Sequence, residues 1–471
     1  METAIADVVI IGGGSAGVGA AYRLQKAGNI KVILIERNTG LGGVSVFGGV
    51  NCWEPGIGGP GIHSILAQRL LSQPGVACVG KSTDFPNSKI RWGLSRSCES
   101  PYETTCLRAG VSKAQWRRFH FEPYAMCQAM RSLFHQNSIQ FLFGAELETV
   151  ERHGRRICSV GIRKKNGETL RVLACLYLDC SGDIALARQA GCRALFGEDG
   201  ADRFGEPSAP EKASNTVNAV SLIFRVSKRN APIYKNGLRE DLEASVRQWM
   251  RKTVETEHLV SAINEYPNGD LNVNMLPTME GAEFFRLGNQ KAMEICQARI
   301  WHYWEWMRRE KGFGDYRIQS IFPMIGIRES WRLSGVYTLT EQDVRAGLGN
   351  QRYANRVVAL ADHALDTHGR TKIKGGRCPE LLRPYGIPYD CMLPVEVDNL
   401  LVACRGSSFS HIAASSARLS RTMLSLGEAA GEAAAWCCRM RQDFSQANLS
   451  HLRRVLRLPQ MEETLFTRFD V

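Results

Sequence analysis

The clearest feature of the hydrophobic pattern lies near the start of the chain, where an apolar run leads into a helical pattern of small residues. Residues 8–11 are all β-branched and apolar, which is typical of a central parallel strand buried on both faces. Residues 15–27 place alanine and leucine at helical spacing, and a second apolar strand pattern follows at 31–35. The three segments predict a βαβ unit.

The turn between the first strand and the helix carries the pattern GxGxxG on Gly12, Gly14 and Gly17. In such a turn the first glycine permits a tight bend, the second lets a pyrophosphate approach the backbone, and the third allows close contact between helix and strand. The phosphates would lie on the free N–H groups at the helix N-terminus, around Ser15 and Ala16. The turn therefore predicts a dinucleotide site.

The stretch after the second strand favours FAD over a nicotinamide cofactor. It opens on an acid that can accept the ribose hydroxyls of an adenosine, and two Gly-Gly pairs follow almost at once. Glycines there would let the backbone wrap a cofactor that extends beyond the pyrophosphate. We expect the contacts of this stretch to come from Glu36, Arg37, Gly42, Gly43, Ser45 and Gly48.

Periodicity predicts further elements more coarsely. We expect a helix at 123–134, strands at 141–147 and 157–172 with a hairpin turn at Asn166–Gly167, a strand at 217–226 and a helix at 283–311. Aromatic residues crowd the last helix at positions that cannot share one face. That helix is expected either to be buried on several sides or to form one wall of a substrate cavity.

Three later segments resemble FAD-dependent oxidoreductases. They read LYLDCSGDIALA at 176–187, NLLVACRGSS at 399–408 and GEAAGEAAA at 427–435. With the first βαβ unit, they make the chain similar to the glutathione-reductase-like members of this family over nearly its full length. The resemblance implies an α/β fold, with a Rossmann-like FAD-binding domain and an inserted α+β substrate domain.

The resemblance also implies how the chain is divided and which later residues meet the cofactor. The FAD-binding domain would comprise 1–193 and 321–438, the substrate domain 194–320, and a helical tail 439–471. Gly182 and Asp183 would return the chain to the cofactor, and Arg405 would contact the FAD phosphate or brace its strand. A helix over 411–435, starting near Ser415 and Ser416, would point its positive end at the flavin, unless these serines merely cap it.

Two residues are candidates for handling the substrate. His411 follows the last cofactor-contacting strand and could accept a proton near neutral pH, although a hydrogen-bonded core histidine would look the same in sequence. Arg328 could hold a substrate carboxylate, or it could belong to a structural ion-pair cluster with Glu329 and Arg332. His63 and Tyr385 are weaker candidates.

Composition and charge add few constraints. The net charge is +12, but the basic residues are scattered and no nucleic-acid-binding motif is present, so a nucleic-acid partner is not expected. The 15 cysteines show no metal-ligand spacing, and we expect no metal site. We expect no leader segment, and no run of apolar residues in the sequence is long enough to cross a membrane. We therefore expect a cytoplasmic protein of undetermined oligomeric state.

These features predict an FAD-dependent oxidoreductase acting on a small molecule. The expected reaction is dehydrogenation of an alcohol or amine, or reduction of an activated double bond, by hydride transfer at flavin N5 with an unidentified electron acceptor or donor. One alternative is an FAD monooxygenase or hydroxylase. Another is an FAD-bearing protein that binds tRNA or another polyanion through its positive charge.

Overall fold

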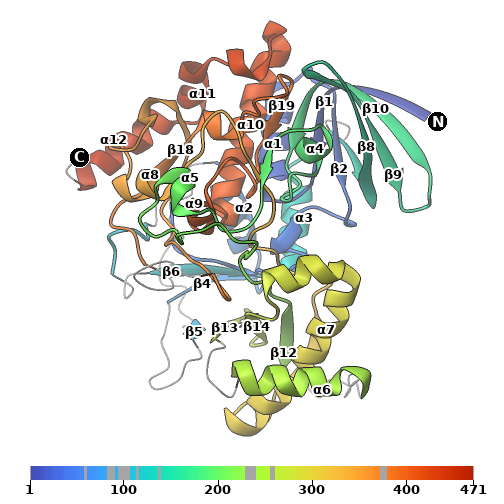
Figure 1. Cartoon of the computed structure of the whole chain (residues 1–471), viewed down its shortest axis with the longest axis vertical. Helices are drawn as coiled ribbons and strands as arrows, with labels where there is room; N and C mark the ends of the chain where they lie inside the picture. Colours follow the sequence, from blue (N-terminus) through green and yellow to red (C-terminus); the bar gives the residue numbers. More distant parts are fainter. Residues whose placement is uncertain are drawn as a thin grey trace.

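The computed structural model describes residues 2–57, 61–81, 91–93, 107–112, 116–135, 139–228, 240–254, 260–371 and 379–469. These residues form two lobes, which Figure 1 shows one above the other. The upper lobe contains both ends of the described chain and a mostly parallel sheet. The lower lobe contains a second, antiparallel-dominated sheet and its helices.

The main sheet is built on the predicted βαβ unit. β1 (Glu2–Ile11) pairs in parallel with β2 (Val32–Glu36), and α1 (Ser15–Ala27) connects them. β10 (Thr169–Asp179) lies parallel to β1 on its other side. β7 (Gln140–Phe143) and β19 (Leu400–Val402) extend the parallel sheet beyond β2 and β10 respectively. This arrangement confirms a mixed α/β fold with a parallel-stranded sheet.

An antiparallel extension completes the sheet. β8 (Ala145–His153) pairs with β9 (Arg156–Lys164), which forms a hairpin with the first half of β10. Gly167 has a φ of +86° at the tip, so the predicted Asn166–Gly167 turn is confirmed. The prediction of one strand over 141–147 is wrong, because Gly144 adopts a φ of +63° and separates β7 from β8.

Close contact between two helices covers one face of this sheet (Figure 1). α10 (Ser420–Met440) crosses α1 at its small residues, where a Cβ on Gly427 or Gly431 would overlap the backbone of Ala16 or Ala20. The two backbones can approach this closely only because glycine and alanine occupy the crossing. The small-residue pattern of 427–435 therefore has a packing role.

The lower lobe holds a five-stranded sheet in the order β15–β12–β14–β13–β5. The strands are β15 (Arg317–Ile321), β12 (Ile223–Ser227), β14 (Leu271–Leu276), β13 (Val260–Glu265) and β5 (Arg91–Gly93). α6 (Glu240–Trp249), a π-helical turn (Met250–Val254) and α7 (Gly281–Glu310) belong to the same lobe. The predicted strand at 217–226 is shorter than expected, and non-helical backbone at Gly288 interrupts the predicted helix at 283–311.

The aromatic residues of α7 mainly form core. Trp304 and Tyr303 are each 1% exposed, and the Trp304 ring packs edge-on against Phe224 of β12 at 5.5 Å between centroids. One face of the sheet thus packs on α7. The opposite face remains for contact with the upper lobe.

The remaining elements connect the lobes or cover the upper one. A three-stranded sheet lies at the lobe boundary, with β4 and β6 between the lobes in Figure 1. It comprises β3 (Cys52–Trp53), β4 (Ala77–Lys81) and β6 (Arg117–Phe121).

The other helices are α2 (Ile62–Leu71), α3 (Pro123–Arg131), α4 (Ala185–Gln189), α5 (Ala201–Phe204), α8 (Glu341–Ala346), α9 (His411–Ala417), α11 (Leu449–Val455) and α12 (Leu458–Phe469). Short 3-10 turns lie at Gly43–Ser45, Ala354–Arg356, Tyr389–Met392 and Phe444–Gln446. Two short pairs remain: β11 (Ala194–Leu195) with β16 (Arg332–Leu333), and β17 (Val357–Ala361) with β18 (Tyr385–Pro388).

Candidate functional site

Each glycine of the GxGxxG turn is required for a different reason. Gly12 has a φ of +103°, and a Cβ there would lie 2.5 Å from the carbonyl oxygen of Cys180 at the end of β10. A Cβ on Gly17 would overlap the Gly12 carbonyl. Gly14 differs, because no heavy atom lies within 4 Å of the position that its Cβ would take. The space beside Gly14 is therefore left open by the fold.

The N-terminus of α1 faces this space with unsatisfied donors. Gly14 is the N-cap of α1, and no side chain caps the helix there. The first-turn N–H groups, which begin at Ser15 and Ala16, have no acceptor within the helix. Free N–H groups and the positive helix end together suit an anionic group. The turn therefore fits the pyrophosphate of FAD.

Glu36 stands beside the turn at the end of β2. Its Oε2 accepts the N–H of Gly13 at 2.6 Å, and its Oε1 accepts the backbone N–H of Asn38 at 2.7 Å. The side chain is buried, and these bonds fix its orientation. Asn38 Nδ2 also donates to Oε1 at 2.6 Å. Since a carboxylate has about four acceptor sites, one remains for a ribose hydroxyl. Glu36 thus fits the adenosine end of FAD.

The first Gly-Gly pair lies directly against the turn. Gly42 donates its N–H to the carbonyl of Gly13 at 2.9 Å, and a Cβ on Gly43 would lie 3.1 Å from the Cα of Gly14. The Gly43–Ser45 turn then leads away from the phosphate space. The Ser45 hydroxyl lies 3.1 Å from that of Ser420. This stretch therefore runs from the phosphate space to the N-terminus of α10.

The second Gly-Gly pair brings the chain to the lower lobe. Met324 donates its N–H to the carbonyl of Phe47 at 3.1 Å, and Asn272 of β14 donates through Nδ2 to the Gly49 carbonyl at 2.9 Å. A Cβ on Gly48 would lie 2.9 Å from the carbonyl oxygen of Val44. The segment expected to hold the flavin therefore lies at the boundary between the lobes.

Asp183 and Arg405 pair with each other. A guanidinium nitrogen of Arg405 contacts Asp183 Oδ1, which also accepts the hydroxyl of Ser330 at 2.7 Å. Burial opposes ionisation of Asp183, but Arg405, and more weakly Arg37, lower the pKa of this carboxyl. Gly182 lies against the Arg405 guanidinium with a φ of +83°. Of the two roles expected for Arg405, this geometry supports the structural brace.

The helix expected to start near Ser415 and Ser416 starts elsewhere. α9 begins at His411, and the side chain of its N-cap Ser410 accepts the N–H of Ala413. Both serines lie in the last turn of α9. Ser415 donates to the carbonyl of Ile412, and Ser416 donates to the carbonyl of His363. The expectation that these serines begin or cap the helix is therefore wrong, and their binding of FAD remains a prediction.

The single helix expected over 411–435 is two separate helices in the structure. α9 ends at Ala417, and α10 begins at Ser420 with no side-chain cap on Leu419. The positive helix end beside Ser45 therefore belongs to α10. Sequence periodicity missed this break because small and polar residues continue through it.

His411 lies in a buried network of charges. Its Nδ1 is 2.7 Å from Glu329 Oε1, and its backbone N–H donates to Asp199 Oδ2 at 2.9 Å. Arg332 pairs with both Glu329 and Asp199. Burial opposes protonation, but Glu329 outweighs it and raises the pKa of His411. Burial likewise disfavours the Glu329 carboxylate, but His411 and Arg332 lower its pKa.

Arg328 points toward a different group of residues. Its guanidinium donates to the Ala219 carbonyl at 2.8 Å and to the Ser221 hydroxyl at 3.0 Å. Among the described residues no carboxylate forms an ion pair with it. Burial and the like charge of Arg418 lower the pKa of Arg328 to about 9, against a weaker opposing effect of Asp366. Arg328 is thus a cation with no carboxylate of the described chain within ion-pair distance, and Asp366 acts on it only from farther away.

Sequence reasoning missed three residues beside Arg328. His368 Nε2 lies 2.8 Å from Asp366 Oδ2, and Arg418 donates to the same oxygen at 3.0 Å. Burial of Asp366 raises its pKa, but His368 and Arg418 outweigh burial and leave that pKa well below its usual range. Burial, with the nearby guanidinium of Arg328, lowers the pKa of His368 despite the opposing carboxylate of Asp366. The sequence offered one signal for this pair, because a single residue separates Asp366 from His368.

The two weaker candidates lie in the interior. His63 is fully buried against Trp53, with 4.7 Å between ring centroids, and burial lowers its pKa well below its usual range. The Tyr385 hydroxyl lies 2.7 Å from that of Ser416. Both arrangements suit packing residues.

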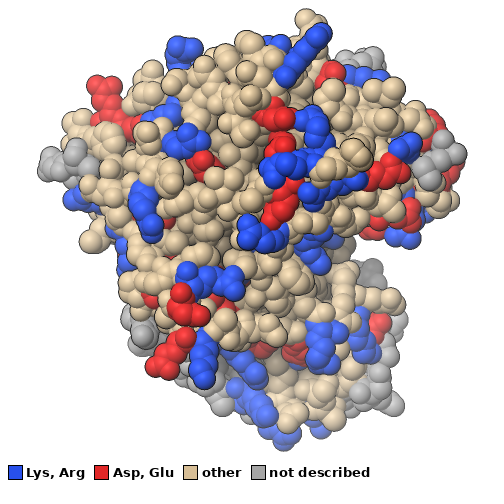
Figure 2. Space-filling view, turned by 45° about the horizontal axis from the view of Figure 1, so that its top comes forward, with Lys and Arg blue, Asp and Glu red and all other residues tan. Residues whose placement is uncertain are grey.

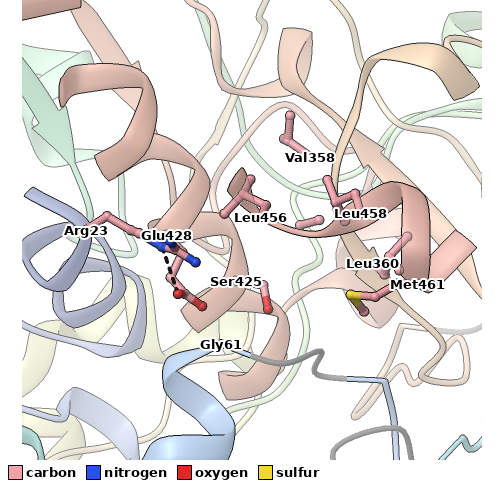
Figure 3. A pocket seen from close by; sticks show the side chains of 10 residues that line it. Arg23, Gly61, Val358, Leu360, Ser425, Glu428, Leu456, Leu458 and Met461 are labelled. Carbon is pink, nitrogen blue, oxygen red and sulfur yellow. Dashed lines mark hydrogen bonds and ion pairs between the residues drawn. The ribbon is translucent and has the colours of Figure 1, made fainter. Parts of the chain in front are cut away.

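A small hollow is lined by residues of α1, α10, β17 and α12 (Figure 3). The Arg23–Glu428 ion pair at 3.0 Å closes one end, and mostly apolar residues of β17 and the C-terminal helices line the rest. Glu428 also accepts the N–H of Ile62 at 3.2 Å. Burial raises the pKa of Glu428, although Arg23 opposes this effect.

The surface view shows charges of both signs. On the face in Figure 2, Lys and Arg are interspersed with Asp and Glu and with uncharged residues. None of the described helices has the length and apolarity that crossing a membrane requires.

Comparisons with solved structures show low identity. The chain is similar to a geranylgeranyl bacteriochlorophyll reductase-like protein from Thermoplasma acidophilum, with 10% identity, a TM-score of 0.45 and coverage of 97% of this chain and 84% of the other. It is similar to the myxobacterial chondrochloren halogenase CndH, an FAD-dependent halogenase, with 12% identity, a TM-score of 0.45 and coverage of 96% and 78%. For the tetracycline destructase Tet(51) the values are 11%, 0.43, 99% and 89%. Among curated proteins no match is found.

The family comparison covers nearly the whole chain. The family described as FAD dependent oxidoreductase matches residues 7–456, which include the glycine turn, Glu36, both Gly-Gly pairs and α10. The residues around the open space at Gly14 fit the cofactor that this family uses. The chain belongs to the FAD-dependent oxidoreductase family, and FAD is its cofactor.

Proposed function

We propose that this oxidoreductase dehydrogenates a small anionic alcohol or amine, or catalyses the reverse reduction, at the boundary between the two lobes. The observation that carries the proposal is Arg328, a cation without a carboxylate partner in the described chain. When bound, FAD supplies a hydride acceptor or donor at N5. The residues of the chain bind the substrate and move its proton.

Two connections support placing the substrate near the flavin. Arg418 lies two residues before Ser420, whose hydroxyl approaches Ser45 in the flavin-side segment. Met324 lies four residues before Arg328 and bonds to Phe47 of the same segment. Arg328 and Arg418 are therefore each close in sequence to a residue that bonds to the segment expected to hold the flavin. A carboxylate or another anion on the substrate would supply the missing counter-ion.

His368 is the proposed proton acceptor. In its neutral form it can donate from Nε2 to Asp366, which leaves Nδ1 as the acceptor of a hydroxyl or ammonium proton. Asp366 fixes the tautomer and Arg418 fixes Asp366, as in other catalytic histidine–carboxylate pairs. His411 is less suited to this task because Glu329 raises its pKa against the effect of burial and so favours the protonated ring, which cannot accept a proton.

Anaerobic reduction of the holoprotein tests the proposal. Small anionic alcohols and amines are screened for loss of the flavin absorbance, and the best substrate is taken to stopped-flow measurements. His368→Gln should slow reduction by roughly 10²–10⁴-fold and should retain FAD. Arg328→Met should mainly raise the KM for the anionic substrate.

The pH profile provides a second readout. Because the pKa of His368 lies below 6.5 and the neutral ring is the base, the rate of reduction should rise with pH through that pKa and level off near neutrality. The profile should disappear in His368→Gln. Unchanged reduction in both variants, or flavin turnover that requires oxygen, NAD(P)H and an aromatic substrate, would contradict this reaction.

A further inference from the structure

The face of the lower sheet that meets the upper lobe carries a group of asparagines. Asn272 on β14 stands directly opposite Asn264 on β13, and Asn274 follows two residues along β14 on the same face. Phe224 and Val273, which stand opposite each other, point the other way, and Phe224 packs against Trp304 of α7. Asn51, from the upper lobe, completes the group. We call Asn51, Asn264, Asn272 and Asn274 the asparagine strip.

The strip is centred on the segment expected to hold the flavin. The carbonyl of Gly49 accepts both the backbone N–H of Asn51 at 2.9 Å and Nδ2 of Asn272 at 2.9 Å. Asn272 Nδ2 also reaches the Tyr266 hydroxyl at 3.0 Å. Asn272 therefore connects the two lobes, and Asn51 bonds to the same carbonyl through its backbone.

Those three side chains have buried polar atoms without partners. Within the described chain no hydrogen bond reaches Oδ1 of Asn264 or Asn274, or either polar atom of the Asn51 side chain. Asn51 is 1% exposed and Asn264 is 8% exposed. Buried amide atoms are normally satisfied, so four unsatisfied atoms on the residues of one strip indicate a missing ligand.

The chemistry of these atoms defines that ligand. The two Oδ1 atoms require hydrogen-bond donors, and Asn51 can both donate and accept, which hydroxyl groups match. Ammonium groups would also donate hydrogen bonds, but a second positive charge is already nearby. Arg328 bonds to Ser221, which lies just before β12, and no carboxylate of the described chain pairs with it. Arg225 on this face is already neutralised by Glu122 and Asp270. The net positive charge therefore favours hydroxyls over ammonium groups.

We propose that the asparagine strip recognises a small substrate rich in hydroxyl groups, whose anionic end is held by Arg328. This inference rests on the proposed function, since it describes the substrate of the same site. Asn274 is half-buried as a residue, whereas its Oδ1 is buried.

Matched ligands separate the hydroxyl contribution from the anionic one. D-gluconate, D-galactonate and hexanoate share a carboxylate on a chain of the same length, and only the sugar acids carry additional hydroxyls. Isothermal titration calorimetry on the FAD-loaded protein measures the Kd of each. One or both sugar acids should bind more tightly than hexanoate, by about tenfold or more. This is the gain expected when a ligand hydroxyl satisfies one or more buried acceptors.

Near-isosteric variants locate that preference. Asn264→Leu and Asn274→Leu should each weaken sugar-acid binding by about five- to tenfold, with hexanoate binding little changed and FAD stoichiometry retained. Asn289→Leu, at an exposed position on α7, is the matched control and should change neither. Loss of FAD from the wild-type protein would instead count against the proposed function.

Three results would overturn the inference while leaving the flavoprotein assignment intact. Hexanoate could bind as tightly as both sugar acids, or neither sugar acid could bind. Alternatively, both leucine variants could keep the full sugar-acid preference. Any of these would make the strip a contact between lobes only.

Discussion

At the scale of single residues, the three glycines of the turn separate packing from binding. Gly12 and Gly17 are held by close contacts with the protein itself, whereas the space beside Gly14 is open. The φ of Gly14 is −71°, which any residue can adopt. A side chain at Gly14 should therefore fit the fold and obstruct only the cofactor.

Gly14→Val tests this distinction. We expect the variant to fold with nearly unchanged thermal stability of the FAD-free protein, and its affinity for FAD to fall by at least about a hundredfold, because the valine methyls occupy the phosphate space. Fluorescence titration with FAD and a melting curve measure the two quantities. Gly17→Val is the contrasting control, which should fail to fold; a yellow Gly14→Val protein with full FAD content would show that the turn is misassigned.

His411 is expected to contribute to stability in a pH-dependent way. Its pKa is raised above 6.5 when folded, so its contribution is complete below pH 6.5 and is lost as the pH rises through the folded pKa. The pKa of Glu329 is lowered, so its contribution is present above about pH 4.5 and is lost on further acidification. The pair should therefore stabilise the fold fully between about pH 4.5 and 6.5.

His411→Gln should lower the free energy of unfolding by about 3–5 kcal/mol at pH 6. The difference from wild type should shrink as the pH rises, because the wild type loses the charge of His411 there. Denaturant titrations at pH 6 and 8.5 measure the difference. A constant difference across that range, or slowed flavin reduction without loss of stability, would favour the catalytic role predicted from the sequence.

The residues that sequence reasoning located are those with a local pattern. The glycine turn and Glu36 follow from spacing alone, whereas the group of Asp366, His368 and Arg418 near Arg328 joins separate segments of the chain. No periodicity reports such a convergence. The same limit applies to Asp183 and Arg405, whose pairing depends on where two loops meet.

At the scale of elements, the crossing of α1 and α10 carries the packing of the upper lobe. Gly431→Val would drive its side chain into the backbone of Ala20. We expect a loss of about 1–3 kcal/mol or more in the free energy of unfolding, since neither backbone can move without disturbing the sheet. Chemical denaturation measures this loss.

Ala430→Val offers a comparison, because that neighbouring buried residue already carries a Cβ. It should be less damaging than Gly431→Val. Equal stability of wild type and Gly431→Val would show that the helices are not in backbone contact.

Element boundaries were predictable where the apolar period is strong. α1 begins and ends at the expected residues, and the Asn166–Gly167 turn is present. The expected elements fail at Gly144, at Gly288 and between α9 and α10. At each place a local backbone conformation interrupts a pattern of side chains that continues through it, so the side-chain pattern alone cannot show the break.

At the scale of the whole molecule, two lobes meet where the flavin-side segment runs. The family match extends over both lobes, so the cofactor fold and the lower sheet belong to one FAD-dependent oxidoreductase. The upper lobe supplies the groups that fit FAD. The lower lobe supplies the polar face and, with Arg328 bonded to it, the proposed means of recognising a substrate.

FAD binding tests this account most directly. The purified chain is freed of any bound flavin, incubated with excess FAD and passed through a desalting column, and the FAD bound per chain is measured from the flavin absorbance. The account predicts a yellow protein with one FAD per chain. A folded protein that emerges colourless, with no FAD bound, would contradict it.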